Sequence, residues 1–155
     1  MKIFIVLICL IAFASSVLGQ DEAVKIEEFE NPLCEEYLSR FDNAIRAAIH
    51  NPTAKIYVFV YEGKDINYKS KGHKIVLAFP QRGLAKIRLD SIKKRLVLNE
   101  FPTENFVFIN GGFRKNFTVE FWLVPAGVKP PEPTPTLRKM RYRKGKPEGL
   151  CTGCC

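Results

Sequence analysis

The chain has 155 residues and a formal net charge of +8, with 24 Lys and Arg residues against 16 Asp and Glu residues. This length leaves room for one domain with a modest core plus appendages, and excludes an array of several domains. Beyond the N-terminal segment, no stretch contains the about 20 consecutive apolar residues that a membrane-spanning helix needs.

Residues 1–19 have the features of an export signal. Lys2 supplies a short basic start, residues 3–13 form an apolar segment, and small residues follow. This order is typical of a secretory signal peptide, here cut before Gln20. We therefore expect a secreted, periplasmic or cell-envelope protein. Residues 20–30 are acidic and lack a clear period, and we expect them to form a loose leader.

The predicted domain spans residues 31–127 and starts with a helix that ends at His50. Asn31 suits the N-cap position, and Glu35 and Glu36 place negative charge in the first turn, where the helix dipole favours it. The apolar residues recur at helical spacing and form one stripe: Cys34, Leu38, Phe41, Ile45 and Ala48.

Residues 54–61 carry large apolar side chains at odd-numbered and even-numbered positions alike, which predicts an interior strand covered on two faces. Gly63 ends this strand, and the polar residues 64–74 predict a long surface loop. The apolar run 75–79 fits either a short strand or the approach to the next helix.

A second helix is predicted over residues 82–99. Its buried stripe consists of Ala85, Leu89, Ile92 and Leu96. Its other sides carry Lys86, Lys93, Lys94 and Arg95, which is typical of the solvated face of an amphipathic helix.

Residues 104–125 contain two strand-forming runs separated by Asn110, Gly111 and Gly112, the pattern of a β-hairpin. Phe113 and Arg114 would lie in its turn and are candidate binding residues. In the second strand, alternation predicts that Val119, Phe121 and Leu123 face the core, with Thr118, Glu120 and Trp122 on the opposite face.

The order helix, strand, helix, strand, strand predicts an α/β (α+β) domain. We expect a small three-stranded mixed sheet with both helices packed on one face. The strands before and after the second helix would lie parallel, and the hairpin would add an antiparallel neighbour.

Residues 128–155 form a predicted proline-rich linker and a basic, cysteine-containing tail. Residues 130–136 favour a polyproline II helix that would hold the tail away from the domain. From residue 128 onward there are seven Lys or Arg against two Glu. An anionic cell-envelope polymer or surface is therefore the expected partner, and the candidate binding residues are Arg138, Lys139, Arg141, Arg143, Lys144 and Lys146.

Four cysteines remain after removal of the signal: Cys34, Cys151, Cys154 and Cys155. An even number in an oxidising compartment predicts disulfides. A bond between the adjacent Cys154 and Cys155 would be strained, so we expect Cys34 to pair with one of them and Cys151 with the other. The alternative is a thiolate metal site at the C-terminus, but no His lies nearby, and we expect no bound metal.

Several segments together resemble a group of uncharacterised exported bacterial proteins: residues 29, 34–36, 40–43, 56–63, 82–85, 110–114 and 118–125. The part from the second helix onward is similar, more distantly, to the C-terminal half of OmpA-like domains. That resemblance implies peptidoglycan binding, with an Asp and an Arg that hold the diaminopimelate group. Asp90 lies inside the second helix and Arg114 in the predicted turn, so neither receives such a role.

The sequence contains no G-x-S-x-G, H-E-x-x-H or phosphate-loop motif and no specific nucleic-acid motif. We therefore expect a protein without enzymatic activity or cofactor, an exported binding or envelope-associated module that uses its basic tail. The alternative is a disulfide-linked structural or assembly subunit, and a hydrolytic enzyme comes third. Asn116 begins a glycosylation sequon whose use depends on the host.

Overall fold

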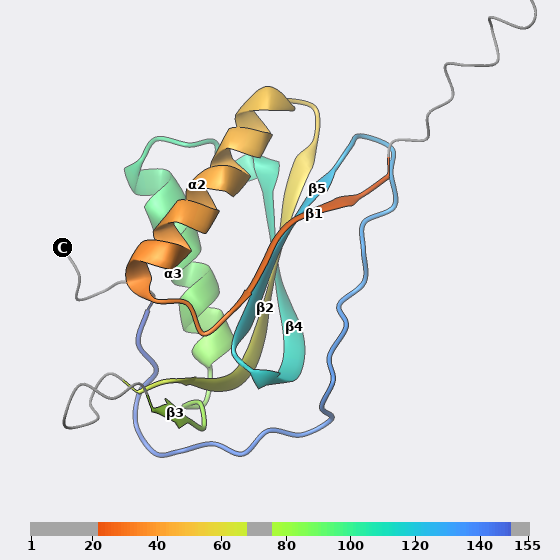
Figure 1. The fold of residues 1–155 in the computed structure, drawn as a ribbon. Helices are drawn as coiled ribbons and strands as arrows, with labels where there is room; N and C mark the ends of the chain where they lie inside the picture. The colour runs from red at the N-terminus through yellow and green to blue at the C-terminus, as the bar shows by residue number, and fades with distance from the viewer. Residues whose placement is uncertain (1–21, 68–75, 150–155) are drawn as a thin grey trace, which may run out of the picture.

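The computed structural model describes residues 22–67 and 76–149 and has an α+β fold, in which two helices pack against a five-stranded, mostly antiparallel sheet (Figure 1). The elements are β1 (Val24–Glu30), α2 (Cys34–His50), β2 (Lys55–Ile66), β3 (Leu77–Ala78), α3 (Leu84–Leu98), β4 (Phe106–Asn116) and β5 (Thr118–Val124), with a short 3-10 helix at Thr103–Asn105. The predicted signal peptide and its cleavage site before Gln20 lie outside the described residues.

Strand β2 is the centre of the sheet. It pairs in parallel with β4 on one side and antiparallel with β5 on the other. Strand β1 pairs antiparallel with β5, and the two-residue β3 pairs with the end of β2. The predicted parallel pairing of the strands that flank the second helix is thus confirmed, but the sheet has five strands instead of three.

Helices α2 and α3 lie on the same face of the sheet, as predicted, and enclose one core (Figure 1). Val58 and Phe121 point into this core and are fully buried, as is Phe41 of α2. The α3 stripe is also confirmed, since Ile92 and Leu96 are fully buried. Burial of such side chains supplies most of the stability of a helix packed on a sheet.

The acidic leader is not loose, because residues 24–30 form the edge strand β1. The pairing of β1 with β5 shifts register between Lys25 and Glu27, so Ile26 is an extra, bulged residue. Ile26 packs against the core and Phe29 belongs to it. Because a bulge breaks the two-residue period of a strand, Ile26 and Phe29 face the core although they are three positions apart. The sequence therefore does not show the alternation that predicts a strand.

The predicted hairpin is wrong. Asn110, Gly111 and Gly112 lie inside β4, and β4 and β5 flank β2 instead of pairing with each other. The register between β2 and β4 shifts here, and a Cβ on Gly111 would lie 2.4 Å from the Tyr61 ring. The glycines therefore mark a bulge beneath an aromatic ring, not a turn.

Strand β2 also continues past Gly63, to Ile66. The connection from β4 to β5 passes directly over Gly63, where a Cβ would lie 2.1 Å from the backbone carbon of Asn116. Phe117 closes this crossing by donating its backbone N–H to the carbonyl oxygen of Lys64. The predicted loop 64–74 thus begins as strand, and its residues 68–74 lie outside the described residues. Of the run 75–79, Leu77–Ala78 forms the short strand β3, and Ile75 lies outside the described residues.

The N-cap prediction for the first helix is wrong as well. Leu33 occupies that position, without a capping hydrogen bond from its side chain. Asn31 has a left-handed backbone with φ of 45°, and its N–H donates to the carbonyl oxygen of Phe117. Glu35 and Glu36 do lie in the first turn, as predicted.

The tail does not stand away from the domain. Residues 128–149, which we name the strap, run along the sheet face opposite the helices and then around the end of the sheet near β3 (Figure 1). Pro135 lies against Gly112, where a Cβ would meet the proline ring at 3.2 Å. The stiff proline segment therefore lies across the domain, contrary to its predicted role as a spacer.

We expect Gly63→Ala to destabilise the fold strongly, because its Cβ would collide with backbone that cannot rotate away. The free energy of unfolding, measured with urea, should fall by about 3 kcal/mol or more. The control is Gly127→Ala, which has φ of 83° but no atom within 4 Å of the new Cβ, and which should cost about 1 kcal/mol. Equal losses for the two variants would contradict the crossing described above.

Candidate functional site

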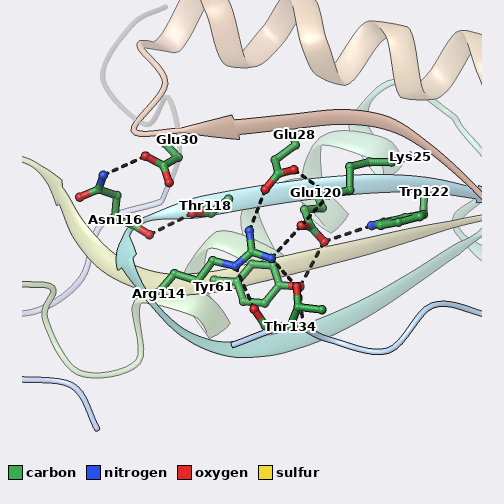
Figure 2. A network of polar contacts seen from close by, with 10 residues as sticks. All are labelled: Lys25, Glu28, Glu30, Tyr61, Arg114, Asn116, Thr118, Glu120, Trp122 and Thr134. Carbon is green, nitrogen blue, oxygen red and sulfur yellow. Dashed lines mark hydrogen bonds and ion pairs between the residues drawn. The ribbon is translucent and has the colours of Figure 1, made fainter. Parts of the chain in front are cut away.

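A buried carboxylate organises the sheet face opposite the helices (Figure 2). The Glu120 side chain in β5 is only 3% exposed. Its Oε1 accepts from Nη2 of Arg114 at 2.8 Å and from Nζ of Lys25 at 3.2 Å. Its Oε2 accepts from the Tyr61 hydroxyl and from Nε1 of Trp122, both at 3.1 Å. Each oxygen therefore has two donors.

These donors set the charge of the site. Burial alone would raise the pKa of Glu120, but hydrogen bonds from Trp122, Arg114 and Lys25 together hold that pKa below its usual range. Glu120 is thus ionised at neutral pH. Because its oxygens are already occupied, it is poorly suited to accept or release a proton as a general acid or base.

Arg114 joins this network to the strap. Its guanidinium lies 3.7 Å from the centroid of the Tyr61 ring and forms an ion pair with Glu28 at 2.8 Å. It also donates to the carbonyl oxygen and the hydroxyl of Thr134 in the strap. Sequence reasoning placed Arg114 in a turn as a binding residue, whereas it lies in β4 with its charge already engaged.

Two further contacts fix the strap along its length. The Phe113 carbonyl oxygen accepts from the backbone N–H of Thr136 and of Leu137, both at 3.0 Å. Phe113 therefore contributes its backbone to the strap and, like Arg114, lies in β4 and not in a turn.

Farther along, the Tyr142 hydroxyl donates to Oε2 of buried Glu62 at 2.7 Å. Burial, together with this hydrogen bond, raises the pKa of Tyr142 to about 12. The other oxygen of Glu62 accepts from the N–H of Ala85 and so caps α3, which has no local side-chain cap.

The predicted tail cations fall into two groups that differ in exposure. Five of them are exposed and form no ion pair with any described residue: Arg138, Lys139, Arg141, Lys144 and Lys146. Arg143 differs, because it is half-buried, donates its backbone N–H to Pro80, and has a buried Nε without a partner among the described residues.

Sequence reasoning missed an ion pair beside Arg143. Oδ2 of Asp65 lies 2.6 Å from Nη2 of Arg88, and both side chains are largely buried. They line a cavity of about 30 Å³ to which Arg143 and Glu148 of the strap also contribute. The signal was present in the sequence: Arg88 falls on the buried side of α3, between Ala85 and Ile92, and a buried arginine needs a partner.

Cys34 is disulfide-bonded. Cys151, Cys154 and Cys155 lie outside the described residues, so the predicted choice of partner stays a prediction. Within residues 22–67 and 76–149, no three His, Cys, Asp or Glu residues come together to hold a metal ion. No helix in the same part of the chain is long and apolar enough to cross a membrane.

The sequon residue Asn116 is engaged in the fold. Its side-chain amide donates to Oε2 of Glu30 at 2.8 Å, and the Thr118 hydroxyl is buried against the Asn116 carbonyl oxygen. A glycan on Asn116 would have to replace the contact with Glu30.

Comparison of the chain with protein-family models, with curated proteins and with solved structures finds no match.

We expect Glu120→Gln to lower the free energy of unfolding at pH 7 by about 3 kcal/mol, because it leaves Arg114 and Lys25 without their buried partner. Folding lowers the pKa of Glu120, so its carboxylate stabilises the protein above the ordinary glutamate pKa. This contribution disappears as the pH falls through the lowered value. Urea unfolding across an acidic pH series should therefore show a weaker pH dependence for the variant than for the wild type.

The control for this series is Glu104→Gln, since Glu104 is an exposed glutamate on the 3-10 helix. Its unfolding free energy and pH dependence should match the wild type. If Glu120→Gln behaved like this control, Glu120 would not be the organising charge of the sheet face.

Proposed function

We propose that this chain is an exported, non-enzymatic binding module that contacts an anionic cell-envelope polymer or surface through the cations of its strap. One observation carries the proposal: Arg138, Lys139, Arg141, Lys144 and Lys146 are exposed and form no ion pair within the described residues. The first three lie between anchors at Thr134 and Tyr142, and the other two follow directly after the anchor at Arg143.

Fixing the backbone favours such binding. A free tail loses conformational entropy when it binds, whereas a segment held against the domain has already lost much of it on folding. The anchors at Thr134 and Tyr142 use backbone atoms and a tyrosine hydroxyl. They leave the five exposed cations available for a partner.

The other charged groups support the same division of roles. Arg114 and Lys25 are committed to Glu120, and Arg88 is committed to Asp65. These three cations are therefore engaged within the fold, whereas the five exposed strap cations are available to an anionic partner. Export rests on the signal-like residues 1–19, and a disulfide-linked assembly subunit stays the alternative function.

The test replaces the five exposed strap cations with glutamine. Because these side chains make no ion pair with the described residues, the fold should persist while retention on an anionic polymer such as polyphosphate falls. Wild-type binding should weaken steeply with added salt, since the Debye length shortens from about 10 Å at 0.1 M to about 3 Å at 1 M. Binding is measured by co-sedimentation and folding by thermal denaturation.

A matched control removes the same number of charges elsewhere: Lys55, Lys86, Lys93, Lys94 and Lys115, all exposed, become glutamine. Both variants have the same net charge. The proposal predicts that only the strap variant loses binding. Equal losses would mean that total charge alone, and not the strap, holds the partner.

A second candidate function concerns the cavity at Asp65 and Arg88. The resemblance to OmpA-like domains, which covers the chain from the second helix onward and so does not include Asp65, implies peptidoglycan binding through a carboxylate and an arginine that hold the diaminopimelate group. The specific observation is the buried Asp65–Arg88 pair, since a zwitterionic amino-acid end needs both charges. A cavity of about 30 Å³ holds little more than water, so Arg143 and Glu148 would have to move.

This candidate makes a separate prediction. Calorimetric titration with meso-diaminopimelate should show binding that is tighter for Arg143→Ala than for the wild type, because the smaller side chain opens the cavity. Asp65→Asn should abolish this binding, and its thermal denaturation should be followed in parallel. Failure of both the wild type and Arg143→Ala to bind would eliminate this candidate and leave the strap proposal intact.

A further inference from the structure

Exposed apolar side chains lie beside the cationic strap. Leu77 of β3 is 42% exposed and Phe79, directly after β3, is 38% exposed. Val76, directly before β3, is 41% exposed. Residues 76–79 therefore carry three large exposed apolar side chains. Single exposed apolar residues are ordinary, but a group of them marks a contact surface.

Cations border this apolar group. Nζ of Lys64 lies 5.2 Å from the centroid of the Phe79 ring, and the guanidinium carbon of Arg141 lies 6.0 Å from it. We name the surface formed by Lys64, Val76, Leu77, Phe79 and Arg141 the β3 surface.

The strap is fixed to the same region, so its residues 141–143 lie beside the β3 surface. Arg143 donates its backbone N–H to the carbonyl oxygen of Pro80 at 3.0 Å and pairs with Gln81 in a β-bridge. The guanidinium carbon of Arg82 lies 5.1 Å from the centroid of the Tyr142 ring. These contacts hold Arg141 next to Phe79.

The nearest acids do not cancel the positive charge. Glu62 is buried and accepts from Tyr142 and Ala85, and Asp65 is paired with Arg88. Residues 138–148 contain six Lys or Arg against one acid, Glu148. The β3 surface thus combines exposed apolar groups with an excess of positive charge.

We propose that the β3 surface docks on an anionic phospholipid bilayer, with Leu77 and Phe79 in the interfacial layer and Lys64, Arg141 and the other strap cations on the headgroups. This inference rests on the proposed function and names its partner. A soluble polyanion offers charge but no apolar phase, so Leu77 and Phe79 would stay exposed to water when it binds. An anionic bilayer offers both, and stable attachment of a peripheral protein commonly needs two such signals.

The test uses the full chain with three partners: phosphatidylcholine vesicles, vesicles of equal parts phosphatidylcholine and phosphatidylglycerol, and polyphosphate. The wild type should bind the mixed vesicles best. The double variant Leu77→Ser/Phe79→Ser should bind them about tenfold more weakly, a change of about 1.4 kcal/mol, and should bind polyphosphate as the wild type does. Phe79→Leu, which keeps an apolar side chain, should retain vesicle binding.

The matched control is Val97→Ser/Leu98→Ser, which removes two exposed apolar side chains from the end of α3, where they are 61% and 71% exposed. It should bind mixed vesicles like the wild type. Equal vesicle binding by Leu77→Ser/Phe79→Ser and the wild type would overturn the inference, as would wild-type binding to polyphosphate but not to vesicles. Neither result would affect the proposed function, which is tested separately by the glutamine variants of the strap and of the matched lysines.

Discussion

The side chain of Tyr61 in β2 contacts three segments that are distant from it in the sequence: β4, β5 and the strap. Its ring lies over Gly111 of β4 and under the guanidinium of Arg114. Its hydroxyl donates to Glu120 of β5 and accepts from the backbone N–H of Thr134 in the strap. One fully buried side chain on the central strand thus contacts both neighbouring strands and the tail. The bulged residue Gly111 has to be glycine, because a Cβ at this position would collide with the Tyr61 ring.

The carboxylate of Glu120 adds a second constraint on the same face. A buried ionised group costs several kcal/mol unless donors surround it, and here the donors come from β1, β2, β4 and β5. The sheet therefore has two cores of different kinds. The helix side is apolar, whereas the strap side combines aromatic rings with a satisfied charge network. Satisfied networks of this kind favour one arrangement of their neighbours over alternatives.

Sequence patterns predicted the helices, the parallel strand pair and the core faces of β5, because regular periodicity survives wherever packing is regular. The predictions failed where bulges interrupt the period. The bulge at Ile26 removes the alternating pattern by which β1 could be predicted, and the bulge at Gly111 gives β4 the composition of a turn. The charged network could not be predicted. Lys25 lies far from Arg114 and Glu120 in the chain, and the strands of Arg114 and Glu120 were wrongly predicted to pair with each other. The same limit hid the pairing of Asp65 with Arg88.

The pairing of β1 with β5 has a consequence for how the protein folds. Val24 lies opposite Leu123, so the first strand of the domain is completed by the last. Contacts between such distant positions form slowly, because the intervening chain must first be ordered. A chain that emerges N-terminus first therefore cannot close its sheet until nearly all of the domain has been synthesised. Helix α2 can form early, but β1 has no partner until β5 arrives, and this delay prolongs the time that the chain spends unfolded.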